Sequence, residues 1–164
     1  MKKYYLISAA MLFVAVFVLS GCTKTAENIV ETSIEASTGG EVDVDLDDNT
    51  LRVETDEGTF EAGESVSLPS GFPSDVYVYD GTITAASTTG EDMFVVSIQS
   101  SDSQTDVKEK YEAELVNDGW EITSTLTLPS GITMGAEKGN RYVTVTAGES
   151  EGETLITVGV STLE

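Results

Sequence analysis

The acidic residues between positions 43 and 54 have a spacing that could bind a divalent cation. Asp43, Asp45 and Asp47 alternate with apolar residues, and the pattern continues through Asn49 to Glu54, the twelfth position counted from Asp43. Calcium-binding loops of the EF-hand type place oxygen ligands at positions 1, 3, 5 and 12. These five residues are therefore a candidate calcium site.

The same segment also has the pattern of a β-strand. Side chains alternate between the two faces of a strand, so Val42, Val44 and Leu46 would share one face and the acids the other. The sixth position of the loop is Asp48, where an EF-hand needs glycine, and no helix of suitable length follows. We therefore favour the strand, with the acids as its solvent-exposed face. A weaker ion site at the turn from Asp45 to Asn49 is compatible with that strand.

Few residues are suited to other chemistry. The chain has no histidine and one cysteine, Cys22, whereas most acid–base, nucleophilic and zinc chemistry uses one or both residue types. A carboxylate pair could hydrolyse glycosides, but 29 acids produce a suitably spaced pair by chance. The sequence also lacks a glycine-rich phosphate loop of Walker or Rossmann type. We predict a non-enzymatic protein with no catalytic residue, and an extracytoplasmic hydrolase is a lesser alternative.

Cys22 follows the features of a secretory signal. Lys2 and Lys3 precede an uncharged apolar run over residues 4–19, which is short for a membrane span. The residues Leu19-Ser20-Gly21-Cys22 resemble the lipobox of bacterial lipoproteins. That resemblance implies cleavage before Cys22 and lipidation of its thiol, which would hold an extracytoplasmic domain at the cell envelope. The anchor would lie in the outer membrane of a diderm cell, or in the outer face of the single membrane of a monoderm cell.

The charge of the mature chain limits its partners. Removing residues 1–21 leaves 143 residues with a net charge of −23, because the signal holds two of the eight basic residues and none of the acids. Such a field repels nucleic acid and anionic lipid headgroups. We expect the membrane as a partner through the lipid on Cys22, together with an unidentified envelope protein or glycan. We interpret the acidity as a solvated surface, with cation binding or a salty habitat as alternatives, and no cofactor is expected beyond the candidate calcium.

The pattern divides the chain into four segments. Residues 63–75 contain Pro69 and Pro73 among several Gly and Ser, which marks a boundary. The segments are a lipoprotein signal peptide (1–21), a lipidated tether with a short helix (22–40), a small β-meander (41–68) and an α+β domain (69–164).

In the last segment the pattern predicts two short strands and one helix, followed by four strands over residues 121–128, 132–137, 141–147 and 154–160. Residues 93–98, which are apolar on both faces, also indicate a central strand. The first two strands would be residues 76–79 and 82–86, joined as a hairpin at Asp80-Gly81. The helix would begin at its cap Ser103, and Gly119 would end it. Val107, Tyr111 and Leu115 form its buried stripe, Trp120 closes one end of the core, and Tyr77 and Tyr79 are interpreted as core residues rather than exposed ligand contacts. The predicted fold class is α+β, an antiparallel β-sheet with one amphipathic helix packed across it, preceded by a short helix and a small β-meander.

Three motifs between residues 71 and 160 carry a family resemblance. They are Phe72-Pro-Ser-Asp-Val-Tyr-Val-Tyr-Asp-Gly81, Tyr111 with Leu115, and Asp118-Gly-Trp120. Together they resemble small uncharacterised bacterial lipoproteins with a PSDV-x-VY-x-G pattern and a helix that ends in Y…L…GW. The resemblance implies a helix-on-sheet domain and supplies no catalytic residue. We expect a membrane-anchored extracytoplasmic lipoprotein that acts as a non-enzymatic binding or structural module. The alternative is a calcium- or cation-responsive surface protein that uses residues 43–54.

Overall fold

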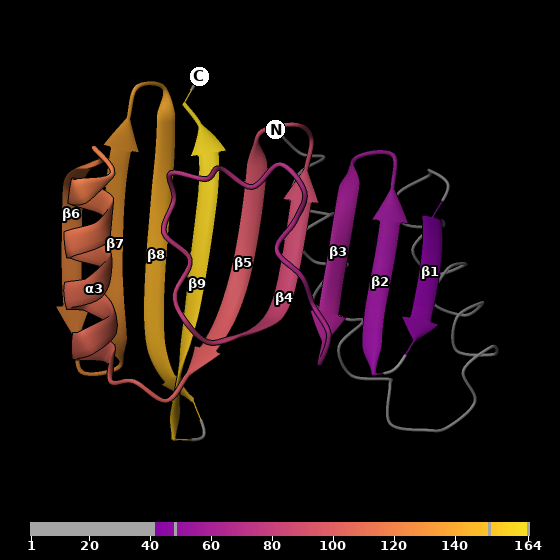
Figure 1. Ribbon diagram of the computed structural model, residues 1–164, viewed down its shortest axis with the longest axis horizontal. Coiled ribbons are helices and arrows are strands. Elements are labelled where there is room, and N and C mark those ends of the chain that lie inside the picture. The colour runs from indigo at the N-terminus through magenta and orange to yellow at the C-terminus, as the bar shows by residue number, and fades with distance from the viewer. Residues whose placement is uncertain (1–41, 48, 151, 164) are drawn as a thin grey trace.

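The structure is a computed structural model, and it describes residues 42–47, 49–150 and 152–163. Nine strands and one helix are found within this part of the chain (Figure 1). They are β1 (Val42–Asp47), β2 (Thr50–Thr55), β3 (Gly58–Gly63), β4 (Thr82–Thr89), β5 (Met93–Ser100), α3 (Gln104–Asn117), β6 (Glu121–Leu128), β7 (Gly131–Lys138), β8 (Arg141–Ser150) and β9 (Glu153–Thr162). The predicted signal peptide, Cys22 and the short helix of residues 22–40 lie outside the described residues. No helix within the described ranges is long and apolar enough to cross a membrane.

All nine strands form one antiparallel sheet. Their order is β1-β2-β3-β4-β5-β9-β8-β7-β6. The chain builds the sheet as two meanders, β1 to β5 and β6 to β9, and the two meet where β5 pairs with β9. α3 connects them and returns the chain to the far edge of the sheet. The two edge strands are consequently β1 and β6.

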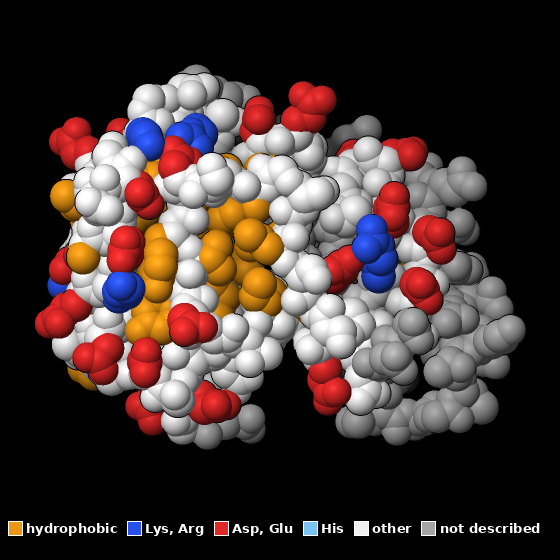
Figure 2. All heavy atoms as spheres, in the orientation of Figure 1, with side chains coloured by type: hydrophobic (Ala, Val, Ile, Leu, Met, Phe, Trp, Pro, Cys, Tyr) orange, Lys and Arg blue, Asp and Glu red, His pale blue; other side chains and the backbone are white. Residues whose placement is uncertain are grey.

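The apolar side chains change from one face of this sheet to the other between β4 and β3. Residues directly opposite each other in antiparallel strands point to the same side. One row across the sheet consists of Met134, Val145, Val158, Val96 and Ala86, all buried, followed by Glu61, Arg52 and Asp45. A neighbouring row on the opposite face consists of Thr144, Gly159, Val95 and Ser87, followed by Phe60, Val53 and Val44. Figure 2 shows the first of these faces, with apolar side chains gathered over the middle of the sheet and charged ones over β2.

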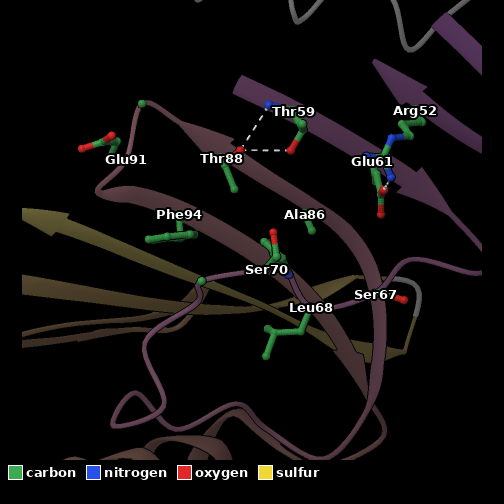
Figure 3. A pocket seen from close by; sticks show the side chains of 13 residues that line it. Arg52, Thr59, Glu61, Ser67, Leu68, Ser70, Ala86, Thr88, Glu91 and Phe94 are labelled. Atoms are coloured by element: carbon green, nitrogen blue, oxygen red, sulfur yellow. Dashed lines mark hydrogen bonds and ion pairs between the residues drawn. The ribbon is translucent and has the colours of Figure 1, made fainter. Parts of the chain in front are cut away.

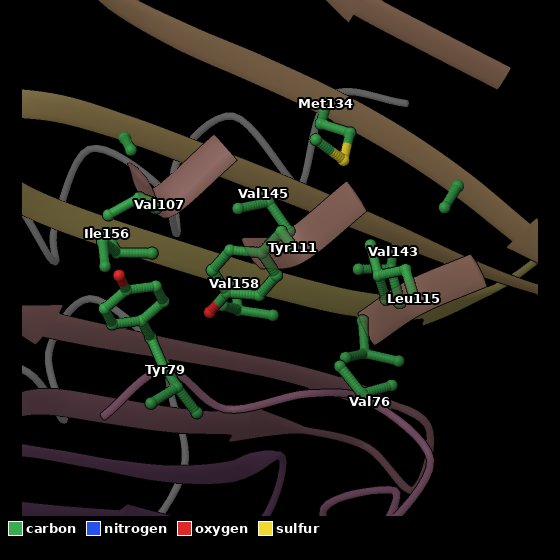
Figure 4. Packing of buried hydrophobic residues seen from close by; sticks show 14 of the residues in the cluster. Val76, Tyr79, Val107, Tyr111, Leu115, Met134, Val143, Val145, Ile156 and Val158 are labelled. Carbon is green, nitrogen blue, oxygen red and sulfur yellow. The ribbon is translucent and has the colours of Figure 1, made fainter. Parts of the chain in front are cut away.

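α3 covers one end of the first face, over β6, β7 and β8. Its stripe of Val107, Tyr111 and Leu115 is fully buried (Figure 4), as predicted. The Ser103 hydroxyl accepts a hydrogen bond from the Asp106 N–H at 3.2 Å and so caps the helix. Gly119 has φ 84° and ends the helix, and the Trp120 N–H then donates to the Leu115 carbonyl at 2.9 Å.

Residues 64–81 cover the rest of that face without forming helix or strand. They lie in front of β9 and β5 in Figure 1, where Val76 and Tyr79 are buried. The predicted hairpin of residues 76–79 and 82–86 is wrong, because β4 pairs with β3 on one side and β5 on the other. Both edges of β4 are therefore occupied, and residues 76–79 pack onto the sheet instead of extending it.

The predicted α+β fold class is also wrong. The described chain is mostly strand, and α3, its one helix, has 14 residues and lies over one end of a nine-stranded sheet. The predicted meander of residues 41–68 is part of this sheet rather than an element that precedes it, because β3 pairs with β4 across the 64–81 segment. Strand patterns do not reveal such pairing between strands that are far apart in sequence. The division of the chain at residue 69 stays a prediction, although its two parts share one sheet.

Candidate functional site

A groove lies on the helix-covered face where the sheet changes from apolar to charged (Figure 3). Its volume is about 580 Å³, which is within the usual range of small-ligand sites. β2, β3 and β4 line one side, and residues 67–71 line the other. The groove forms at this place because the apolar row ends at Ala86 and the next residue in the row is Glu61. A covering apolar segment has nothing to pack against beyond that point.

Hydroxyl and charged groups line the strand side of the groove. The Thr59 N–H donates to the Thr88 hydroxyl at 3.1 Å, and the two threonine hydroxyls lie 2.9 Å apart. Arg52 forms an ion pair with Glu61 and lies 3.5 Å from a Glu54 oxygen. The Arg52 side chain is 51 % exposed, so it can still exchange one carboxylate for another. These groups could bind a ligand that carries both donors and acceptors.

An apolar wall completes the groove. Phe94 is 8 % exposed and makes an edge-to-face contact with Phe72, with ring centroids 5.9 Å apart. Gly71 has φ 85°, which favours glycine, and a Cβ atom there would lie 3.8 Å from the Phe94 ring. Leu68 is exposed beside them. The groove therefore offers a ligand an exposed leucine and the small accessible part of an aromatic ring, as well as polar partners.

The candidate calcium residues lie on the hairpin of β1 and β2, and the preferred strand interpretation is confirmed. Asp43 lies opposite Glu54 and Asp45 opposite Arg52, so a guanidinium is placed among the carboxylates. Asn49 has φ 64° and forms the turn, while the Asp47 side chain lies outside the described part. Among the described residues no three His, Cys, Asp or Glu side chains group to hold a metal ion. The calcium site stays a prediction, and the extended hairpin lacks the curved loop on which its EF-hand form depends.

A second polar cluster surrounds Asp75. Arg141 donates two hydrogen bonds to the Asp75 carboxylate at 2.8 and 2.6 Å, and Lys138 donates a third at 2.7 Å. The Trp120 indole N–H donates to the Asp75 carbonyl at 2.6 Å, and Arg141 lies 5.0 Å from the Trp120 ring centroid. The Arg141 hydrogen bonds hold the pKa of Asp75 well below its usual range, although burial opposes this. The cluster fastens the 64–81 segment to the β7–β8 turn, so we assign it a structural role.

Three tyrosines pack together beneath that segment. The rings of Tyr79 and Tyr111 stack with centroids 5.9 Å apart, and Tyr77 meets both edge-on. The Tyr79 hydroxyl donates to Asp102 at 2.7 Å. Burial raises the pKa of Tyr79 and of Tyr111 above the usual range, so both hydroxyls stay protonated at neutral pH. The prediction that Tyr77 and Tyr79 belong to the core is confirmed, as is the position of Trp120 in that core.

Sequence reasoning missed the groove. Its polar residues, Arg52, Thr59, Glu61 and Thr88, belong to three strands that come together only when β3 pairs with β4. One signal was present, because Arg52 is the only basic residue between positions 41 and 68. A single cation among so many acids indicates a specific contact, but the sequence does not show which carboxylate it meets.

Comparison with known proteins gives one similarity. A family model described as START domain-like matches residues 81–153. The matched part includes β4, β5, α3, β6, β7 and β8, and it ends at the first residue of β9. No curated protein and no solved structure matches the chain. The chain is thus similar to START-like domains over the helix-bearing part of its sheet.

Proposed function

We propose that this chain is a lipid-anchored extracytoplasmic lipoprotein whose sheet domain binds a ligand in the groove between residues 67–71 and strands β2–β4. The observation that carries the proposal is the groove itself, where an aromatic wall meets an exchangeable ion pair and a hydroxyl pair. Concave sites that combine apolar walls with a few polar groups are typical of ligand binding. START-like domains usually bind ligands, which supports binding over catalysis.

The charge of the molecule favours a cationic ligand with an apolar part. Glu61 and Glu91 line the groove, and Asp45 lies opposite Arg52 on the neighbouring strand. A cation that displaces Arg52 from Glu61 would keep the carboxylate paired, while an apolar group would cover Phe94. A net charge of −23 on the mature chain also draws cations toward this surface.

The groove is tested with a fluorescently labelled peptide that contains two lysines and one phenylalanine. We expect saturable binding by fluorescence anisotropy to the full chain in mild detergent, and no binding of a matched peptide with glutamates in place of lysines. Ser70→Trp, which fills the groove from its 67–71 side, should weaken binding at least tenfold. Ser101→Trp adds the same side chain at an exposed position outside the groove lining and should leave the affinity unchanged.

Equal loss of affinity in both tryptophan variants, or none in either, would show that the groove is not the binding site. A lysine peptide that binds with strong salt dependence in every variant would reduce the interaction to general charge attraction.

The anchor is tested separately from the groove. Its support is the Leu19-Ser20-Gly21-Cys22 sequence after an apolar signal. Cells that express the full chain should incorporate labelled palmitate into it, and Cys22→Ser should abolish the label and leave the signal uncleaved. Label that persists in Cys22→Ser would contradict the anchor and leave the groove proposal intact.

A further inference from the structure

The two edges of the sheet differ in how they meet other molecules. At one edge β1 carries the exposed Asp43 and Asp45, and charged side chains on an edge strand discourage a second strand from pairing with it. At the other edge β6 has the sequence EITSTLTL, with one charge at its first residue. The second edge therefore lacks the charges that protect the first.

β6 is also open along most of its length. Every residue from Thr123 to Leu128 is exposed, including Leu126 at 56 % and Leu128 at 50 %. Among the described residues β6 pairs with β7 alone. α3 lies over the face of the sheet and not beyond its edge (Figure 1).

The register of the β6–β7 hairpin shows which backbone groups point outward. Leu128 and Gly131 flank a two-residue turn and form its hydrogen-bonded pair, and the pairing alternates from there. Ser124 and Leu126 therefore bond to β7, while Thr125 and Thr127 direct their N–H and C=O groups away from the sheet. Such a row of free backbone groups is a template for another strand.

We propose that β6 pairs antiparallel with β6 of a second copy of this chain, across a two-fold axis at Leu126. This register brings Leu126 next to Leu126 of the partner subunit and Leu128 next to Ser124 of the partner subunit. Thr125 then exchanges backbone hydrogen bonds with Thr127 of the partner subunit, so the outward groups of both strands are satisfied.

The distribution of charge favours β6 as the paired edge and a second copy of the chain as its partner. Two copies of the chain, each with a net charge of −21, repel each other over most of their surfaces. β6 is uncharged from Ile122 to Leu128, and the antiparallel register holds the two Glu121 side chains at opposite ends of the joined strands. Pairing through β1 would instead bring the aspartates of one copy against those of the other. A self-complementary strand also fits the closed two-fold symmetry of most homodimers.

The test is the oligomeric state of the full chain in mild detergent, measured by sedimentation velocity over a range of concentrations. We expect a monomer–dimer equilibrium whose dissociation constant rises at least tenfold in Leu126→Lys, which places a cation against its own copy. Thr127→Pro removes one outward N–H without touching the β7 pairing, and we expect a similar loss. Val116→Lys is the matched control, because Val116 is 59 % exposed on α3, and its dimerisation should equal that of the wild type.

A cross-link gives an answer that does not depend on how the variants fold. Cys22 is the only cysteine, so Cys22→Ser with Leu126→Cys leaves one thiol, which the proposed axis places beside its own copy. Oxidation should join most of the chains, whereas Cys22→Ser with Leu155→Cys, at another exposed leucine, should stay uncoupled. A wild type that remains monomeric at the highest concentration, or a dimer that persists in both edge variants, would overturn the proposal.

Discussion

The two parts of this sheet share one hydrogen-bond ladder and bury opposite faces. In β4–β9 the apolar side chains point toward α3 and residues 64–81, and they form the main core. In β1–β3 the same face carries Asp45, Arg52 and Glu61, while Val44, Val53 and Phe60 point to the other side. Continuous backbone pairing therefore does not make one core. Because the side-chain period of a strand is two, a change of one residue in phase between β3 and β4 is enough to exchange the faces.

The two parts also differ in what fixes their surfaces. The larger part is formed by β4–β9, α3 and residues 64–81, and the smaller part by β1–β3. The larger part is held by the Asp75 cluster, in which the side chains of Asp75, Lys138 and Arg141 are each about one-third exposed. The smaller part has ion pairs around Arg52, a side chain that is 51 % exposed, and exposed pairs of this kind contribute little to stability. The groove lies at the junction of these two parts, between β3 and β4.

The largest expected effect compares the same substitution in the two parts. Leu115→Ala should lower the free energy of unfolding by about 3 kcal/mol, because Leu115 is fully buried under α3 and its removal leaves a cavity. Leu51→Ala on β2 should cost about 1 kcal/mol, because Leu51 is half-buried. Urea denaturation followed by circular dichroism measures both. Equal losses would mean that β1–β3 is packed as firmly as the rest.

The Asp75 cluster should account for the next largest difference. Asp75→Asn removes a carboxylate that accepts three charge-assisted hydrogen bonds, and we expect a loss of about 2 kcal/mol at pH 7. Glu54→Gln, which affects only the exposed Arg52 pair, should change the stability by less than about 0.5 kcal/mol. A loss in Glu54→Gln that matches the loss in Asp75→Asn would remove this distinction between the two parts.

The Asp75 carboxylate should also make the stability of the fold depend on pH. The folded pKa of Asp75 lies below its ordinary value of 3.8, so the unfolded chain takes up a proton first as the pH falls. The stabilisation by Asp75 is therefore complete above about pH 5 and is lost progressively below pH 4. Thermal melting between pH 7 and pH 3 should show a smaller fall for Asp75→Asn than for the wild type. Parallel curves would show that other carboxylates cause the acid sensitivity.

Two tyrosines in the larger part should respond in opposite directions. Among the described residues the buried Tyr111 hydroxyl makes no hydrogen bond of normal geometry, and a backbone group of Tyr79 offers it only a weak one, so Tyr111→Phe should stabilise the fold by less than about 1 kcal/mol. The Tyr79 hydroxyl donates to Asp102, so Tyr79→Phe should destabilise it by about 1 kcal/mol. Thermal melting of the two variants beside the wild type measures both changes. Destabilisation by Tyr111→Phe would indicate that its hydroxyl has a partner after all.

The smallest expected effect concerns calcium and the smaller part. Arg52 lies among the hairpin carboxylates, so calcium should raise the melting temperature no more than sodium chloride of equal ionic strength. A saturable rise specific to calcium, lost in Asp45→Asn with Asp47→Asn, would establish the cation-responsive alternative.

Much of the local structure follows from the sequence. The period of Val107, Tyr111 and Leu115 predicts α3, and Ser103 and Gly119 predict its ends. The alternation of residues 42–46 predicts β1, and the later strands follow their patterns closely, with β7 at Gly131–Lys138 and β8 at Arg141–Ser150. These features are local, because the residues that decide them lie within a few positions of one another.

The Asp75 cluster and the groove could not be predicted from the sequence in the same way. Asp75 meets Lys138 and Arg141 across more than sixty positions, and Arg52 shares the groove with Phe94. The prediction for residues 76–79 was wrong for a related reason, since their alternating pattern fits a strand but no strand edge was free to accept them.

The sequence by itself determined where strands and the helix form, which side chains alternate, and how strongly acidic the molecule is, because propensity, period and charge are properties of neighbouring residues. Tertiary structure alone decided that β3 pairs with β4, that the apolar face changes sides at that junction, and that a groove opens there. Pairing between distant strands depends on which edges remain unoccupied once the rest of the chain has packed, and no single segment carries that information.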